Sequence, residues 1–183
     1  IDAYKTAWSE YASRIQYEPL EYNITGEVNN EAAGNVQIPH NICEDVITAS
    51  PNYGYHFVRW NDGNTDNPRT IVLASDTSFT AEFAKNTYTI STTSANPEWG
   101  TTAGGKSALY LDEVEISATA NYGYHFVKWN DNNTSNPRTV TISKDTTFTA
   151  TFAKNVYSIT ANAAHGSILG NSSAEYLDEV TLS

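Results

Sequence analysis

Apolar and polar residues alternate in two closely similar stretches of the chain. Between Arg69-Thr-Ile-Val-Leu-Ala74 and Arg138-Thr-Val-Thr-Ile-Ser143, Ile71 and Leu73 are replaced only by other apolar residues. The two positions that follow them, Val72 and Ala74, become Thr and Ser. Substitution that is tolerated at every second position predicts a β-strand with one face on a hydrophobic core and the other in water.

The same alternation extends to other segments and predicts an all-β class. It assigns Phe79, Ala81 and Phe83 to the core. It also places Val114 and Ile116 inside, with Glu113 and Glu115 outside. A composition rich in Thr, Ser, Asn and Tyr, with no Met, suits pleated and half-buried surfaces better than helices.

The block Tyr53-Gly-Tyr-His-Phe-Val-Arg-Trp60 departs from this alternation at one point. Tyr55 and Phe57 share a face, whereas Trp60 falls on the opposite parity, so a bulge or a strand end is needed to bring it inside. The following segment, residues 61–68, is dense in turn-forming residues. Gly63 there is replaced by Asn132 in the later copy, which predicts a positive φ at this position.

These blocks recur along the chain. Residues 53–90 align with 122–159 without a gap and differ at only twelve of thirty-eight positions, which excludes chance. Tyr110-Leu-Asp-Glu-Val114 likewise recurs as Tyr176-Leu-Asp-Glu-Val180. We therefore predict tandem modules at 21–85, 86–154 and 155–183. The third is incomplete, because the chain is cut there or because the structural unit is permuted relative to this frame.

The first twenty residues lie outside the repeat. Asp2 can cap a helix that would place Tyr4, Trp8, Tyr11 and Ile15 on one face. Residues 1–20 are therefore predicted as a short helix that ends a preceding domain or caps the first module.

Charge narrows the classes of partner. Twenty-one acidic residues against ten Lys and Arg give a formal net charge of −11, which disfavours binding to nucleic acid or to anionic lipid. No apolar run approaches the roughly 18–20 residues that span a bilayer, so no membrane insertion is expected of this segment.

The residues that could support catalysis are few. Of the four histidines, His40, His56, His125 and His165, two occupy the same repeat position within a predicted strand. His40 stands close to the lone Cys43, but a thiol and imidazole pair needs an orienting group and a pocket. Cys43 has no partner for an internal disulfide, and no nucleophile elbow, phosphate loop or zinc-ligand pair is present. We predict no enzyme activity and no cofactor.

Two weaker candidates for ligand binding remain. Asp62, Asn64 and Asp66 have the spacing of a calcium loop, but Asn67 and Leu73 stand where its glycine and closing glutamate belong. An Asx-rich hairpin loop is the favoured interpretation, and no metal is predicted. Twenty-two aromatic residues leave room for a carbohydrate-stacking platform, and Trp99, in the turn 96–100, is its best exposed candidate.

The motifs also carry a resemblance. Tyr-Gly-Tyr-His-Phe-Val-Lys-Trp129, an Asn-rich loop and Asp145-Thr-Thr-Phe-Thr-Ala-Thr-Phe-Ala153 resemble the divergent internalin B-repeat modules of bacterial surface proteins over about 21–183. This resemblance implies a β-grasp-like fold and an extracellular or cell-surface location. It also implies a role as a stalk or adhesion unit, without catalytic residues. Residues 3–15 resemble the closing segment of surface leucine-rich repeat domains.

The sequence therefore predicts a non-catalytic spacer or stalk that presents a recognition or adhesion domain, with neighbouring domains of the same chain as partners. Two alternatives stay open. The repeats bind a glycan or host protein themselves, by strand addition or through an aromatic turn, or they form an accessory domain of a secreted enzyme.

Overall fold

The computed structural model describes residues 22–38, 45–170 and 172–183. Within these ranges it contains fifteen β-strands and no helix, so the all-β prediction is confirmed. The helix predicted over 1–20 lies outside the described residues, as do His40 and Cys43. Among the described residues no helix is long and apolar enough to cross a membrane.

The chain divides into two compact units. The first holds the residues up to Asn52 together with Phe57–Phe83, and the second holds Tyr53–His56 together with Ala84–Ser183. The first half of the aromatic block therefore groups with the residues of the next copy.

Two small sheets face each other in the first unit. One sheet has the order β1-β6-β4, formed by Ile24–Val28, Thr77–Lys85 and Tyr55–Trp60, with β1 and β6 parallel. The other has the order β2-β3-β5, formed by Gly34–Gln37, Asp45–Pro51 and Arg69–Ile71, with antiparallel pairing throughout.

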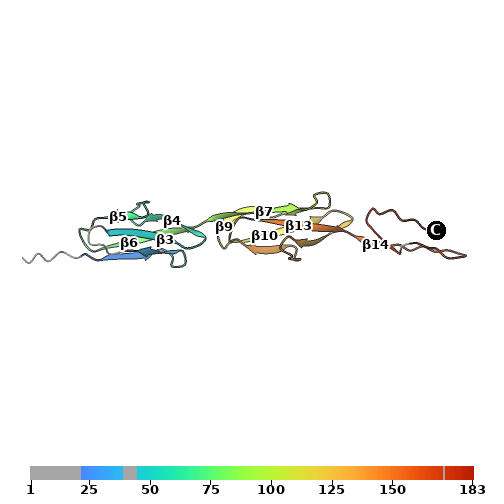
Figure 1. Cartoon of the computed structure of the whole chain (residues 1–183), viewed down its shortest axis with the longest axis horizontal. Helices are drawn as coiled ribbons and strands as arrows, with labels where there is room; N and C mark the ends of the chain where they lie inside the picture. The colour runs from blue at the N-terminus through green and yellow to red at the C-terminus, as the bar shows by residue number, and fades with distance from the viewer. Residues whose placement is uncertain (1–21, 39–44, 171) are drawn as a thin grey trace, which may run out of the picture. The chain divides into compact units, whose positions relative to one another are not determined.

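The second unit repeats these two sheets and adds one strand to the larger of them. Figure 1 shows its main strands, and its larger sheet has the order β11-β13-β7-β9, formed by Tyr124–Trp129, Thr146–Lys154, Thr87–Ser94 and Lys106–Leu109. Here β7 and β13 are parallel neighbours, as β1 and β6 are in the first unit. The smaller sheet has the order β12-β10-β8, formed by Arg138–Thr141, Glu113–Ala120 and Gly100–Ala103.

The described residues after Asn155 contain one strand pair. β14, Val156–Ser158, is antiparallel to β15, Ser173–Glu175. Among the described residues of this segment, none belongs to the buried hydrophobic core, whose last member is Phe152.

Burial follows the predicted alternation. Ile71 is 8% exposed, whereas its neighbour Val72 is 96% exposed. Phe79, Ala81 and Phe83 are buried on β6, and Val114 and Ile116 are buried on β10. The face assignments made from substitutions between copies are therefore confirmed.

The parity conflict at the tryptophan is resolved by a bulge. The register of β11 against β13 shifts between Phe126 and Lys128, so Val127 is the extra residue and Trp129 turns inward. Trp60 and Trp129 are both fully buried, and each packs against a phenylalanine of its own strand, Phe57 or Phe126. The predicted positive φ is also confirmed, at 84° for Gly63 and 66° for Asn132.

We expect Ile71→Ala to destabilise the first unit by about 2–5 kcal/mol, because it removes buried side-chain volume that the core cannot refill. The adjacent change Val72→Ala should stay within about 0.5 kcal/mol, because Val72 lies in water. Urea denaturation followed by tryptophan fluorescence measures both. Equal effects of the two substitutions would contradict the face assignment.

Candidate functional site: a repeated tyrosine cluster

The loop that suggested a calcium site closes on itself through hydrogen bonds. Asp62 Oδ1 accepts from the Asn64 amide at 3.1 Å, and Asn64 Oδ1 accepts from the Asp66 amide at 2.7 Å. The carbonyl of Asp66 then accepts from Nε1 of the buried Trp60 at 2.9 Å. Within the described residues no group of three or more His, Cys, Asp or Glu side chains could hold a metal ion. The Asx-rich loop therefore satisfies the indole N–H, which would otherwise be buried without a partner.

An arginine side chain pairs with the carboxylate of Asp62. The Arg69 guanidinium donates to both oxygens of Asp62, at 2.9 and 2.8 Å, and lies 5.0 Å above the ring of Phe79. The arrangement recurs with Arg138, Asp131 and Phe148. The hydrogen bonds from arginine, reinforced by a backbone amide, hold the pKa of each aspartate below its ordinary value.

Trp99 is more covered than the sequence suggests. Its ring is half-buried, packs against the core of the second unit and stacks on Tyr124 with centroids 5.0 Å apart and an angle of 18°. Its backbone N–H bonds to Asn96 and its carbonyl accepts from Asn121. These contacts anchor the turn 96–100, and the role of Trp99 in ligand binding stays a prediction.

The repeated histidines have the same structural contact. His56 Nδ1 lies 2.8 Å from Asn86 Oδ1, and His125 Nδ1 lies 2.9 Å from Asn155 Oδ1. Both side chains are exposed. Each imidazole holds the asparagine that follows the last strand of its copy.

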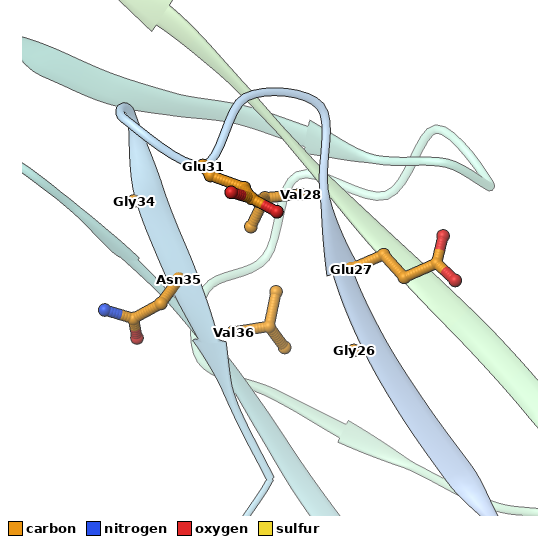
Figure 2. Close-up of a pocket in the computed structure, with 7 residues that line it drawn as sticks. All are labelled: Gly26, Glu27, Val28, Glu31, Gly34, Asn35 and Val36. Atoms are coloured by element: carbon orange, nitrogen blue, oxygen red, sulfur yellow. The ribbon is translucent and has the colours of Figure 1, made fainter.

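A groove of about 570 Å³ lies between β1 and β2 of the first unit. Figure 2 shows Val28 and Val36 pointing into the space between these strands, while Glu27 and Asn35 point away from it. A groove of about 500 Å³ in the second unit runs along β7 to β9 and is lined by Thr, Ser and Lys residues together with Ile90, Ala103 and two glycines. Both linings contain aliphatic residues and glycines, but the first carries two glutamates and the second a lysine, so the charged groups of the two grooves are not repeated.

The contact that does repeat is a cluster of tyrosines in the second unit. Tyr110 follows β9, and its ring meets those of Tyr53, Tyr55 and Tyr88 edge-on, with centroids 5.7, 5.6 and 6.4 Å away. The Tyr110 ring lies directly over Gly54, where a Cβ atom would overlap it. We call this set, Tyr53, Gly54, Tyr55, Tyr88 and Tyr110, the first tyrosine cluster.

Backbone hydrogen bonds hold the first tyrosine cluster in place. The Asn86 amide donates to the carbonyl of Gly54 at 2.8 Å, and the Tyr110 amide donates to the carbonyl of Asn86 at 2.9 Å. The Tyr53 hydroxyl donates to the carbonyl of Ser143 at 2.8 Å. Partial burial, together with the nearby phenols of Tyr88 and Tyr110, raises the pKa of Tyr53.

A second tyrosine cluster repeats this geometry one copy later. Tyr176 follows β15, and its ring lies over Gly123 and beside Tyr122, Tyr124 and Tyr157, with centroids 5.7, 5.4 and 6.4 Å away. The backbone bonds recur as well, from the Asn155 amide to Gly123 at 2.8 Å and from the Tyr176 amide to Asn155 at 2.9 Å. Leu111 and Leu177, each following its tyrosine, have φ values of 65° and 64°.

An ion pair accompanies each cluster. Lys85 Nζ lies 3.5 Å from Asp112, and Lys154 Nζ lies 2.9 Å from Asp178. The hydrogen bond in the second pair raises the pKa of Lys154 and lowers that of Asp178. Both pairs are partly exposed, so they contribute little to stability and mainly favour one position of the turn.

Comparison with known proteins agrees with this repeated geometry. The family model for the divergent InlB B-repeat domain matches residues 22–87 and again 90–156. The chain belongs to this family. No curated protein and no solved structure matches it.

From the sequence of these B-repeats, the tyrosine clusters were not predicted as a site. The same residues were used to recognise the repeat. The Tyr-Gly-Tyr block, the Tyr88 and Tyr157 positions and the Tyr-Leu-Asp-Glu-Val motif all defined the period. The sequence placed Tyr55 on the same face as Phe57, and the structure shows its ring in contact with Tyr110. The available clue was that a glycine, Gly54 and Gly123, and a tyrosine, Tyr110 and Tyr176, each occur twice in the repeat, since glycine marks a close approach.

We expect Gly54→Ala in the first B-repeat copy to cost about 2–5 kcal/mol, because it combines a φ of 86° with overlap on the Tyr110 ring. Gly63→Ala is the matched control. Its φ is 84°, but nothing lies within 4 Å of the added Cβ, so it should cost only about 1–2 kcal/mol. Urea denaturation measures both.

The double variant Gly54→Ala with Tyr110→Ala isolates the ring contact. If the ring causes the excess cost, the combined loss should fall short of the sum of the single losses by about 0.5–3 kcal/mol. Strict additivity, or equal costs at Gly54 and Gly63, would show that the ring does not constrain the glycine.

We also expect the melting temperature to fall as the pH drops from about 5 to below 4. Asp62, Asp131 and Asp178 have lowered pKa values in the folded state, so their stabilising contribution is full above the unfolded-state pKa. It is lost as the pH falls through the folded-state pKa. Scanning calorimetry at a series of pH values tests this expectation.

In the double variant Asp62→Asn with Asp131→Asn, the melting temperature should fall less steeply as the pH drops. The control Glu113→Gln, at an exposed position on β10, should retain the original slope. An unchanged slope in the double variant would rule out the two arginine-paired carboxylates as its source.

Proposed function

We propose that this chain is an extracellular, non-catalytic spacer or stalk segment that presents a neighbouring domain at the bacterial surface. The InlB B-repeat family is associated with bacterial surface proteins, which supports the location. The observation that carries the proposal is the distribution of repeated residues. They serve the core, the loop over tryptophan and the tyrosine clusters, while the candidate ligand sites differ between copies.

The proposed organisation follows the repeat. Modules lie at 21–85 and 86–154, with a partial module at 155–183, and the joint between the first two is as short as Ala84-Lys-Asn-Thr87. Residues 1–20 would belong to the end of an upstream leucine-rich repeat domain. This upstream domain is the proposed partner that the segment holds away from the cell.

A relation to the β-grasp fold belongs to the same proposal. In each unit the first strand of a copy pairs in parallel with its last strand, β1 with β6 and β7 with β13. This parallel pair, which is central in the larger sheet of the second unit, supports a β-grasp-like ancestry. The helix that such folds place against the sheet has no counterpart among the described residues.

The experiment that tests the spacer role is a binding screen of the purified chain against glycans, mucins and host matrix proteins. A spacer should show no saturable binding at micromolar concentrations. The variant Trp99→Ala and the milder Trp99→Phe are measured alongside, with thermal melting to verify that each remains folded.

Saturable binding by the wild-type chain would overturn the spacer role. Its loss in folded Trp99→Ala would assign the site to the turn 96–100 and favour the glycan- or protein-binding alternative. Binding retained in that variant would place the ligand site elsewhere on the repeats.

A further inference from the structure

The second tyrosine cluster forms although the described residues after Asn155 contribute nothing to the buried core. Val156, Leu169 and Leu177 are exposed, and no described residue after Asn155 belongs to the buried core. Nevertheless Tyr176 takes the same place over Gly123 that Tyr110 takes over Gly54. The position of this tyrosine is therefore set by its contacts with the preceding copy.

Almost all of those contacts are with residues up to Asn155, earlier in the chain. The Tyr176 ring meets Tyr122 and Tyr124, its amide donates to Asn155, and Asp178 pairs with Lys154. Gly123 and Asn155 belong to the ends of β11 and β13, which carry Trp129 and Phe152 of the buried core. The turn thus covers the end of the sheet to which that core belongs.

The receiving surface is specific for an aromatic ring. Gly123 is buried with a φ of 86°, and a Cβ atom there would overlap the Tyr176 ring. Tyr122 and Tyr124 flank it in T-shaped contact with the Tyr176 ring, at interplanar angles of 85° and 77°. Edge-to-face packing of this kind adds stability beyond the buried area.

We propose that each Tyr-Gly-Tyr block is a docking surface for the tyrosine turn of the next copy, and that this turn stabilises the copy before it. The partner is the Tyr-Leu-Asp-Glu-Val segment of the same chain. The coupling is mutual: the preceding copy positions the turn, and the docked turn stabilises that copy. The proposal does not rest on the spacer role, since it concerns folding alone.

Hydrogen exchange followed by mass spectrometry on the full chain tests the proposal. In Tyr176→Ala we expect amide exchange in β11 and β13 to accelerate about tenfold or more, because local opening becomes easier when its cap is lost. Exchange in β3 and β6, in the first unit, should stay unchanged and serves as the internal reference.

Two control variants separate the ring contact from general fraying of the final segment. Tyr176→Phe keeps the ring and should exchange like the wild type. Leu169→Ala alters an exposed residue of the same segment, 70% exposed, and should leave β11 and β13 unaffected. Tyr110→Ala should accelerate exchange in β4 and β6, the corresponding strands of the earlier copy.

Unchanged exchange of β11 and β13 in Tyr176→Ala would overturn the proposal. So would an equal acceleration in Leu169→Ala, since the loss would then come from disorder in the final segment. The hydrogen-exchange result does not bear on the binding screen. If the docking proposal fails, the proposed spacer role is therefore still open to its own test.

Discussion

Burial of one indole ring in each of the first two copies is the constraint on which the rest of the fold depends. Trp60 and Trp129 are fully buried, and each indole N–H needs an acceptor in a place that water does not reach. The loop after the strand supplies a carbonyl, and its Asx hydrogen bonds shape it for that task. The strand must also carry a bulge, because regular alternation would turn the tryptophan outward.

A small module with two open sheets leaves the ends of its strands uncovered. Modules of this size bury a limited fraction of their surface and gain from contact with neighbours. In the proposed docking, the tyrosine clusters supply such contact through rings, backbone hydrogen bonds and one ion pair each. The glycine beneath each ring allows the approach, since no other residue leaves space for it.

Features that recur between the copies can be compared with features that differ, and the comparison distinguishes a structural role from a ligand-binding role. Trp99 anchors its own turn through Tyr124, and the grooves of the two units have different linings. By contrast, the arginine above a phenylalanine and the tyrosine above a glycine recur with nearly the same geometry. The repeated contacts are thus explained by folding.

The sequence by itself determined the all-β class, the period and the inward faces of the strands, because a strand with one buried face tolerates polar replacement only on the other. It also determined the positive φ at Gly63 from its replacement by Asn132. Only the tertiary structure decided that Tyr55 meets Tyr110 and that β7 pairs in parallel with β13. Those contacts join residues more than fifty positions apart, and alternation along a strand specifies which face a side chain takes but not which distant residue it meets.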